Sequence, residues 1–310
     1  MLAKADDFFS VKNENPLLRG IYLPLPVDSR SAAPAAWSAM LTAENTTNVE
    51  NRGSEHLFVD GEATTLRLAY DAPLASGWRY RVSLPITHDG GGVLDRAIER
   101  WHAWFGLPRG QRPYHPRNEL DYLYFGNPSN PARVIQIDQP HTGIGDASAE
   151  IGWSALEDHA RSVSVWGGIE APTGSAEHLT GNGAWDASVW AHAEQRLARW
   201  HFGAEAGVVQ ALGDAVFGGA GRRTSAFARG AATWIAGPTW SWRLQVEGQT
   251  ARVKDTELRF LGPSVLLSVG ADVALNRRWR LALGLSEDAA VNTAPDVTFF
   301  VGLRRAAALR

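Results

Sequence analysis

Residues 184–197 read AWDASVWAHAEQRL, and this stretch decides the fold class. One set of alternate positions is mostly polar or charged: Asp186, Ser188, Trp190, His192, Glu194 and Arg196. The positions between them carry no charge: Ala187, Val189, Ala191, Ala193, Gln195 and Leu197. A helix would mix the two sets, whereas a strand places successive side chains on opposite faces. The stretch therefore predicts a β-strand with one charged and one uncharged face.

The same alternation recurs through most of the chain. In residues 78–87, for example, Trp78, Tyr80 and Val82 alternate with Arg79 and Arg81. Many of these stretches exceed the roughly 5–6 residues usual in soluble sheets and reach the roughly 9–11 that a tilted strand needs to cross a membrane. We predict twelve strands, at residues 35–48, 56–71, 77–88, 145–157, 160–171, 184–197, 200–211, 224–236, 239–251, 257–273, 278–287 and 295–305.

The connections between these strands alternate in length. Tight links are expected at residues 72–76, 158–159, 198–199, 237–238 and 274–277, and most other connections are longer, with 89–144 the longest. An even strand number with short and long connections in turn is typical of an outer-membrane β-barrel whose termini are periplasmic. Tryptophans next to the tight links would form an interfacial girdle: Trp78, Trp200, Trp240, Trp242 and Trp279.

The direction of the uncharged face separates a soluble ligand carrier from a membrane barrel. A closed sheet of twelve strands is too wide for side chains to fill as an ordinary core. We therefore expect the uncharged face to point outward to lipid, and the charged face to line a lumen. The expected location is the bacterial outer membrane, with lipid and lipopolysaccharide as neighbours.

Composition excludes several other classes of protein. The 310 residues include no Cys, which excludes disulfides, thiol nucleophiles and Cys-ligated metals. Thirty basic against 33 acidic side chains lack the basic surplus of a nucleic-acid binder. No apolar run reaches the roughly 18 residues of a membrane helix. The sequence predicts no cofactor or metal, and it leaves protein partners open.

The chain divides into an N-terminal segment, residues 1–34, and a barrel, residues 35–310. Ala3-Lys4-Ala5 fits the small-x-small pattern of a signal-peptidase site, so we expect a secretory signal to end there and the true start codon to lie upstream. The run Ile21-Tyr22-Leu23-Pro24-Leu25-Pro26 is too rich in proline for a central strand. Two alternatives remain for this segment: it stays in the periplasm, or it enters the barrel and narrows the pore.

The long insert, residues 89–144, contains a predicted helix at 93–106, in which apolar residues recur at helical spacing. A small hairpin is expected around residues 127–130. Insert residues that could form a lid, a plug or a partner surface are Asp95, Trp101, His102, Arg112 and Arg117.

Several short motifs lie along the chain, among them Asn15-Pro16-Leu17, Asp60-Gly61-Glu62, Gly91-Gly92-Val93-Leu94-Asp95, Phe105-Gly106-Leu107-Pro108 and Arg117-Asn118. Together these motifs resemble an uncharacterised bacterial family, domain-of-unknown-function family 3187. The similarity covers most of the chain and implies an outer-membrane-type barrel, without implying an activity, a substrate or a catalytic residue. A departure is the end of the chain, where a tail follows Phe299-Phe300 instead of the terminal aromatic residue usual in such barrels.

Candidate chemistry is sparse, and three functions stay open. The first is a narrow channel for small polar solutes. The second is a closed structural or interaction barrel, plugged by the 93–106 helix or the N-terminal segment. The third is an envelope hydrolase using Asp60, Glu62 or His102, although two carboxylates on one strand face are more simply a structural pair near Arg79 and Arg81. The predicted lumen-lining residues are Arg67, Arg79, Arg81, Asp186, His192, Glu194, Arg196, Arg243 and Glu247.

Overall fold

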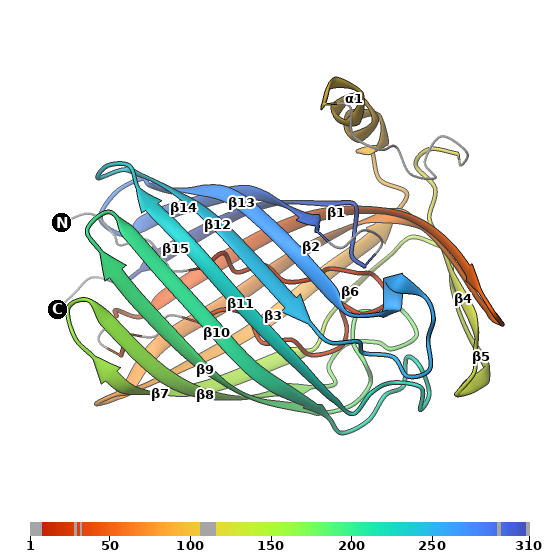
Figure 1. Ribbon diagram of the computed structural model, residues 1–310, viewed down its shortest axis with the longest axis horizontal. Coiled ribbons are helices and arrows are strands. Elements are labelled where there is room, and N and C mark those ends of the chain that lie inside the picture. Colours follow the sequence, from red (N-terminus) through yellow and green to blue (C-terminus); the bar gives the residue numbers. More distant parts are fainter. Residues whose placement is uncertain (1–7, 28–29, 32, 106–115, 290–292, 308–310) are drawn as a thin grey trace.

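The computed structural model describes residues 8–27, 30–31, 33–105, 116–289 and 293–307. Twelve antiparallel strands form a closed barrel, which confirms the predicted fold class (Figure 1). The barrel strands are β1 (Ala36–Arg52), β2 (Glu55–Ala75), β3 (Trp78–Gly90), β7 (Ala147–Glu157), β8 (Arg161–Ala171), β9 (Asp186–Leu197), β10 (Trp200–Ala211), β11 (Thr224–Ile235), β12 (Trp240–Gln249), β13 (Ser264–Ala274), β14 (Trp279–Asp288) and β15 (Val297–Ala306).

The barrel closes where its first strand meets its last. β1 pairs antiparallel with β15 from Ala36↔Ala306 to Asn45↔Val297, and its other edge pairs with β2. Closure satisfies the backbone groups of both edge strands, which a membrane requires because lipid offers no hydrogen-bond partners. We call the end of the barrel with the tight links between strands the turn end, and the opposite end the loop end (Figure 1).

Strand ends differ clearly from prediction at three places. At the first, β2 runs on to Ala75 instead of residue 71 and pairs there with the start of β3, so the expected tight link at 72–76 is shorter. β1 and β2 run on to Arg52 and Glu55 as one tight hairpin, because β4 (Asp121–Asn127) pairs with residues 56–60 of β2 beyond the end of β3. β13 begins at Ser264 instead of residue 257. Phe260 and Leu261 of the 3-10 turn η2 (Arg259–Leu261) are buried in an apolar cluster, so the chain bends there before the strand starts.

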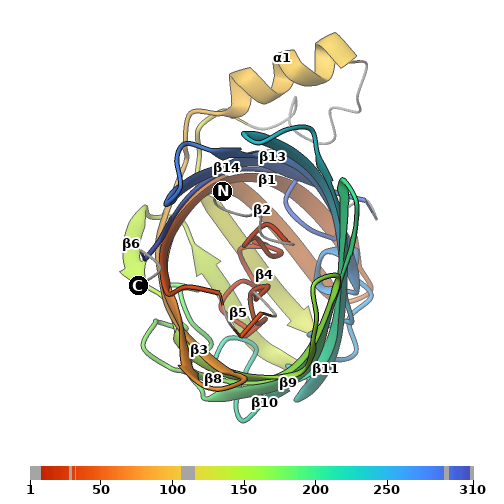
Figure 2. The same cartoon turned by 90° about the vertical axis from the view of Figure 1, so that its left-hand side faces the viewer.

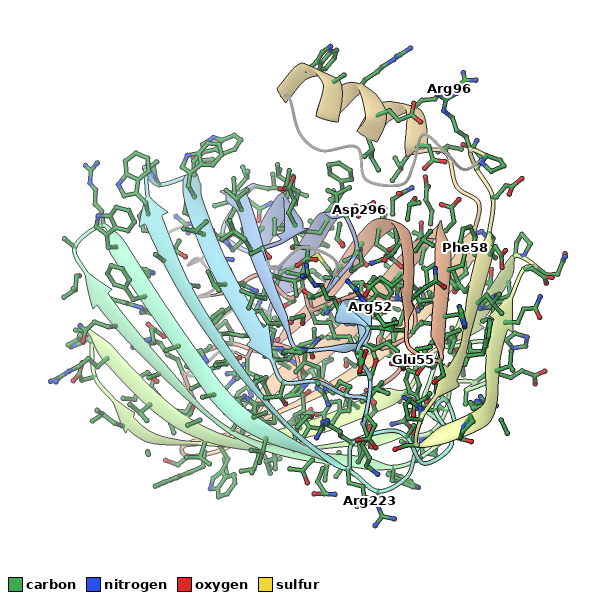
Figure 3. The ribbon with its side chains drawn as sticks, turned by 45° about the vertical axis from the view of Figure 1, so that its right-hand side comes forward. Arg52, Glu55, Phe58, Arg96, Arg223 and Asp296 are labelled. Carbon is green, nitrogen blue, oxygen red and sulfur yellow. The ribbon has the colours of Figure 1, made fainter. Side chains whose placement is uncertain are left out.

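The insert forms a separate layer at the loop end. The expected hairpin is β4 with β5 (Asn130–Ile137), and β6 (His141–Ile144) pairs with the end of β3. Figure 3 shows Glu55 beside this hairpin. Its buried carboxylate accepts hydrogen bonds from the Tyr124 hydroxyl (2.8 Å), the Asn127 amide (3.3 Å) and the Glu257 backbone N–H (2.8 Å). Glu55 therefore joins the hairpin to the connection between β12 and β13.

The helix α1 (Asp95–Phe105) lies outside the barrel, above the wall (Figure 2). The Glu62 carboxylate accepts hydrogen bonds from the backbone N–H groups of Val93 and Leu94 and from the Asn45 amide. A carboxylate at a helix N-terminus is favourable because unpaired N–H groups and the helix dipole meet it there. Glu62 thus anchors the start of the helix to the outer face of β2.

The two faces of the strands have the predicted directions. On β9, Val189 is 51% exposed on the outside, whereas Trp190, His192 and Glu194 are buried inside. The expected girdle tryptophans Trp78, Trp200, Trp240 and Trp242 are also exposed. In the described part of the chain, no helix has the length and apolar character to span a membrane.

Candidate functional site: the occupied lumen

Residues 8–27, which we call the luminal segment, run inside the barrel as two limbs joined by a turn (Figure 2). The first limb contacts Gln245 in the middle of β12 and then Glu247 and Ser264 nearer the loop end. The turn, at residues 15–20, lies at the loop end, and the second limb returns toward the turn end. The segment is almost completely buried by the barrel wall.

Polar contacts to the wall position the first limb. The Phe9 backbone N–H donates to Gln245 Oε1 (2.8 Å), and the Asn13 N–H donates to Glu247 Oε1 (3.1 Å). The Phe9 ring packs 4.7 Å from the Phe300 ring and 4.5 Å from the guanidinium of Arg243. Inward positions of β12 and β15 thus hold this limb with two hydrogen bonds and one aromatic contact.

The turn is the most apolar part of the luminal segment. Leu17 and Leu18 are buried in a cluster with Tyr122 of β4 and Phe260 of η2. The Asn15 amide donates to the Phe260 carbonyl (2.7 Å), while Asn15 Oδ1 accepts from the Leu17 N–H (3.0 Å). Such an Asx arrangement favours a turn, so this conformation places the leucines under the insert hairpin.

A buried ion-pair cluster locks the turn to the wall and the insert. Arg19 Nη2 lies 2.5 Å from both carboxylate oxygens of Asp89, and Arg19 Nη1 lies 3.5 Å from Glu44. The Arg19 and Asp89 side chains are 4% and 0% exposed. Asp89 also accepts from the Tyr122 hydroxyl (3.3 Å) and lies 3.2 Å from His141 Nε2. The Asp89 carboxylate, on wall strand β3, therefore contacts the luminal segment through Arg19 and the insert through Tyr122 of β4 and His141 of β6.

The second limb lies along strands β7 to β10. The Tyr22 N–H donates to Asp186 (3.2 Å), and its hydroxyl donates to Glu150 (3.2 Å). Further toward the turn end, the Val27 N–H donates to Glu205 (3.2 Å). Past the end of the luminal segment, Arg30 reaches Glu194 at 2.9 Å. The limb therefore offers donors to a row of wall carboxylates.

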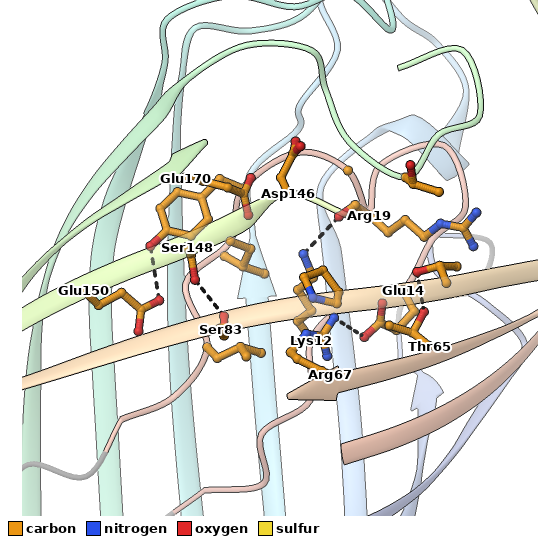
Figure 4. A pocket seen from close by; sticks show the side chains of 17 residues that line it. Lys12, Glu14, Arg19, Thr65, Arg67, Ser83, Asp146, Ser148, Glu150 and Glu170 are labelled. Atoms are coloured by element: carbon orange, nitrogen blue, oxygen red, sulfur yellow. Dashed lines mark hydrogen bonds and ion pairs between the residues drawn. The ribbon is translucent and has the colours of Figure 1, made fainter. Parts of the chain in front are cut away.

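A cavity remains between the luminal segment and strands β2, β3, β7 and β8 (Figure 4). Its volume of about 30 Å³ is room for about two water molecules. Lys12 lies in it and donates to the Arg19 carbonyl (3.0 Å), and Glu14 pairs with Arg67 (3.2 Å). Ser83 and Ser148 bridge β3 and β7 along its side (2.7 Å). The lining is charged and polar, as in an aqueous passage.

Burial changes the protonation of groups around this cavity. Desolvation is the largest cause that lowers the pKa of Lys12, and the nearby charge of Arg67 lowers it further. Burial also raises the pKa of Asp146, in the connection between β6 and β7, against hydrogen bonds from the Gly174 and Asn182 backbone N–H groups. Burial therefore disfavours the charged forms of both Lys12 and Asp146.

His141 carries a pH dependence that can be measured. Its pKa is raised, first because of its hydrogen bond with Asp89, which also faces Arg19 and Tyr122; the His178 ring lies 5.0 Å away. A raised folded-state pKa gives stability that is complete below the unfolded value of about 6.5 and is lost as pH rises through the folded value. We expect the stability advantage of the natural chain over His141→Gln to shrink between about pH 6 and 9. Urea unfolding at both pH values measures it, and an unchanged or growing difference would contradict the assignment.

All nine predicted lumen-lining residues occupy inward positions. Arg67 pairs with Glu14 of the segment, and Arg81 donates to the Pro26 carbonyl (2.5 Å). Six of the other seven pair with charged residues of the wall: Arg79 with Asp71 (2.5 Å), Arg243 with Asp272 (2.6 Å), His192 with Glu205 (2.9 Å), Glu247 with Arg229 (2.5 Å), and Arg196 with Glu194. The seventh, Asp186, accepts a hydrogen bond from the Tyr22 N–H of the second limb.

Sequence reasoning missed several lumen residues and the main role of the segment. Arg229 and Asp272 could have been found, because they share the inward parity of their strands. Asp89 was assigned to the insert although it ends β3. No periodic signal marks Arg19 or Tyr22, since the luminal segment is neither helix nor strand.

The structure does not assemble the suggested hydrolase site. Asp60 and Glu62 are on the outward face of β2, where Asp60 accepts from the Thr47 hydroxyl (2.9 Å) and Glu62 holds the helix start. Arg79 and Arg81 lie elsewhere, so the expected pairing with these carboxylates is wrong. The His102 side chain lies outside the described residues. Among the residues that are described, no group of three potential ligands could hold a metal ion.

The insert residues form an external contact. Asp95 accepts from the Asn118 N–H (2.8 Å) and the Asn45 amide (3.0 Å), and Arg117 pairs with Glu99 (2.7 Å). The Trp101 side chain and Arg112 are outside the described part of the chain. The lumen is occupied by the luminal segment and not by this helix (Figure 2).

Comparisons with known proteins agree with this architecture. An outer membrane channel from Pseudomonas putida F1 has a similar structure at 14% identity, with a TM-score of 0.57 over 93% of this chain and 98% of that chain. The NanC porin is similar at 8% identity, with a TM-score of 0.52 over 88% and 100%. No curated protein matches the sequence.

The closed twelve-strand sheet, its outward apolar band and its charged interior define an outer-membrane β-barrel. The chain belongs to the family described as protein of unknown function DUF3187, whose model matches residues 4–306.

Proposed function

We propose that this protein is an outer-membrane channel for small polar solutes whose lumen is closed, in the conformation seen here, by its own luminal segment. The carrying observation is the chemistry of the contact between segment and wall. Each limb packs in a small apolar cluster, the first through Phe9 and Val11 and the second through Tyr22, Leu23 and Val27. Beside these clusters, both limbs make hydrogen bonds and ion pairs to inward side chains. Water and a polar solute can replace such contacts, so displacing the segment would leave a hydrated passage.

The orientation supports the same proposal. With the turn end periplasmic and the loop end extracellular, the luminal segment enters from the periplasm and turns beneath the insert. Lipopolysaccharide of the outer leaflet would then surround the loop end. The Arg19–Asp89 contact lies where the insert joins the wall, so a movement of the insert would reach the segment directly.

A reversible tether tests the closing role of the segment. The absence of native cysteine makes an engineered pair unambiguous. Asn13 Nδ2 lies 3.0 Å from Ser264 Oγ, so Asn13→Cys with Ser264→Cys would join the segment to β13. In planar bilayers we expect the oxidised protein to stay closed, and the reduced protein to show openings that reoxidation abolishes.

The matched control joins two wall strands. Ser268 and Ser286, both inward, have hydroxyls 2.6 Å apart on β13 and β14. A Ser268→Cys and Ser286→Cys disulfide leaves the segment untethered and should not alter conductance. If the Asn13→Cys/Ser264→Cys protein conducts equally when oxidised and when reduced, the luminal segment does not close the lumen. Absence of conductance in the reduced, untethered and natural chains would instead favour a closed structural barrel, the alternative supported by the buried Arg19 cluster.

A further inference from the structure

The carboxylates of the lumen are not evenly distributed around the wall. Strands β7 to β10 are described throughout, and their inward positions carry no lysine and one arginine, Arg196, near the turn end. Elsewhere the wall mixes both signs, as in Arg79 with Asp71 and Arg243 with Asp272. The inward carboxylates of β7 to β10, here called the acidic wall, are Glu150, Glu170, Asp186, Glu194 and Glu205.

Wall arginines and acidic-wall carboxylates depend differently on the segment. Arg79 and Arg243 keep a carboxylate of the wall itself as partner, and Arg229 keeps Glu205 and Glu247. By contrast, Asp186 takes its hydrogen bonds from the Tyr22 N–H (3.2 Å) and the Asn182 amide (2.6 Å). Removing the segment would take an acceptor from two wall arginines, since Arg67 pairs with Glu14 and Arg81 donates to the Pro26 carbonyl. It would take a donor from five wall carboxylates: Asp89, Glu150, Asp186, Glu205 and Glu247. Removal therefore uncovers acidic groups more than basic ones.

The upper part of the acidic wall also contains unused acceptors. Glu150 Oε2, Glu170 Oε2 and Asp186 Oδ1 are buried and have no hydrogen-bond partner among the described residues. Glu150 Oε2 does face a cation of the wall, Arg81 Nη1, at 4.0 Å. Glu150 and Glu170 line the cavity of Figure 4, and Lys12 of the segment occupies the same cavity. The segment thus places its own amine in an acceptor-rich site.

We infer that the open lumen is cation-selective, and that Glu150, Glu170 and Asp186 bind small organic cations such as polyamines where Lys12 lies in the closed state. This inference rests on the proposed channel function. Rings of Asp and Glu select cations in pores, and a cleft lined by one sign of charge concentrates counter-ions. An ammonium ion would satisfy the acceptors that the segment leaves unused.

Reversal potentials in a KCl gradient test the selectivity, using the reduced Asn13→Cys/Ser264→Cys protein in its open state. We expect K⁺ to permeate about tenfold better than Cl⁻ at low salt, at the lower end of the effect of a one-sign cleft. Adding Glu150→Gln, Glu170→Gln and Asp186→Asn should bring the ratio close to one. Spermidine should block the Asn13→Cys/Ser264→Cys protein. The protein that also carries the three neutralising substitutions should bind spermidine at least about tenfold more weakly.

Asp60→Asn in the same background is the matched control, because Asp60 is an outward carboxylate and its loss should leave selectivity and block unchanged. If the triple variant does not fold, Glu170→Gln alone should still lower both readouts. Conductance that is anion-selective, or that keeps its selectivity after neutralisation, would overturn the inference while leaving the channel intact. Absence of any conductance would instead overturn the proposed function.

Discussion

Arg19→Ala is expected to open the lumen and to have the largest effect of any single substitution in the luminal segment. It leaves Asp89 without its guanidinium partner at a position with no solvent, and it also removes the cation facing Glu44. Breaking a buried ion pair from one side costs about 3–5 kcal/mol, because the remaining charge stays buried. Release of the segment hydrates Asp89 and Glu44, so we expect frequent bilayer openings together with a lower urea midpoint.

Arg117→Ala is the matched control for this prediction. Arg117 also pairs with a carboxylate, Glu99, but its side chain is 52% exposed, and exposed pairs contribute about 0–1 kcal/mol. Arg19→Lys should be intermediate, since an ammonium keeps the charge but lacks separate nitrogens for Asp89 and Glu44. Arg19→Ala behaving like Arg117→Ala in both unfolding and conductance would show that this cluster does not hold the segment.

The second large effect concerns the lipid-facing surface. Ala191 lies in the middle of β9, outward and opposite Ala206 of β10. Ala191→Arg is expected to lower the free energy of unfolding in lipid vesicles by about 2–4 kcal/mol, the usual cost of a charge at the bilayer midplane. The measurement is the urea dependence of the change in gel mobility between folded and unfolded barrel.

Val93→Arg tests whether this effect belongs to the membrane. The Val93 side chain is 77% exposed in the insert, and a substitution there leaves the backbone contact with Glu62 in place, so stability should change by no more than about 0.5 kcal/mol. A neutral Ala191→Arg would mean that the outward face of β9 does not meet hydrocarbon. Equal losses for the two variants would point to a general effect of arginine.

Much of the barrel could be predicted because each strand carries its own evidence. Alternation in residues 184–197 gives the strand and the inward side of Glu194 without knowledge of any other strand. Residues 49–52 and 72–75 were not assigned to strands, because the ladder in both places depends on a partner strand. Residues 49–52 of β1 pair with the start of β2, which β4 flanks on its other side. Residues 72–75 of β2 pair with the start of β3. The start of β13 was misplaced for a related reason, since Phe260 turns into a cluster formed by distant residues.

The candidate site could be predicted only in part. The alternation along each strand identifies which charged side chains face inward, and the predicted lumen residues do face inward. It does not say which charges meet, because the register between strands and the path of a non-repetitive segment have no local signal. Arg19 and Asp89 are 70 residues apart in sequence, and their contact exists only because the barrel closes around the segment.

The sequence by itself determined a twelve-strand barrel with an uncharged outer face and a charged lumen, since a strand displays its two faces in its own residues. The tertiary structure alone decided that residues 8–27 fill that lumen, that Asp60 and Glu62 face away from it, and that the acidic groups gather on β7 to β10. The physical reason is that these facts depend on which strands become neighbours and on what the closed sheet surrounds, and neither is a property of any single stretch of sequence.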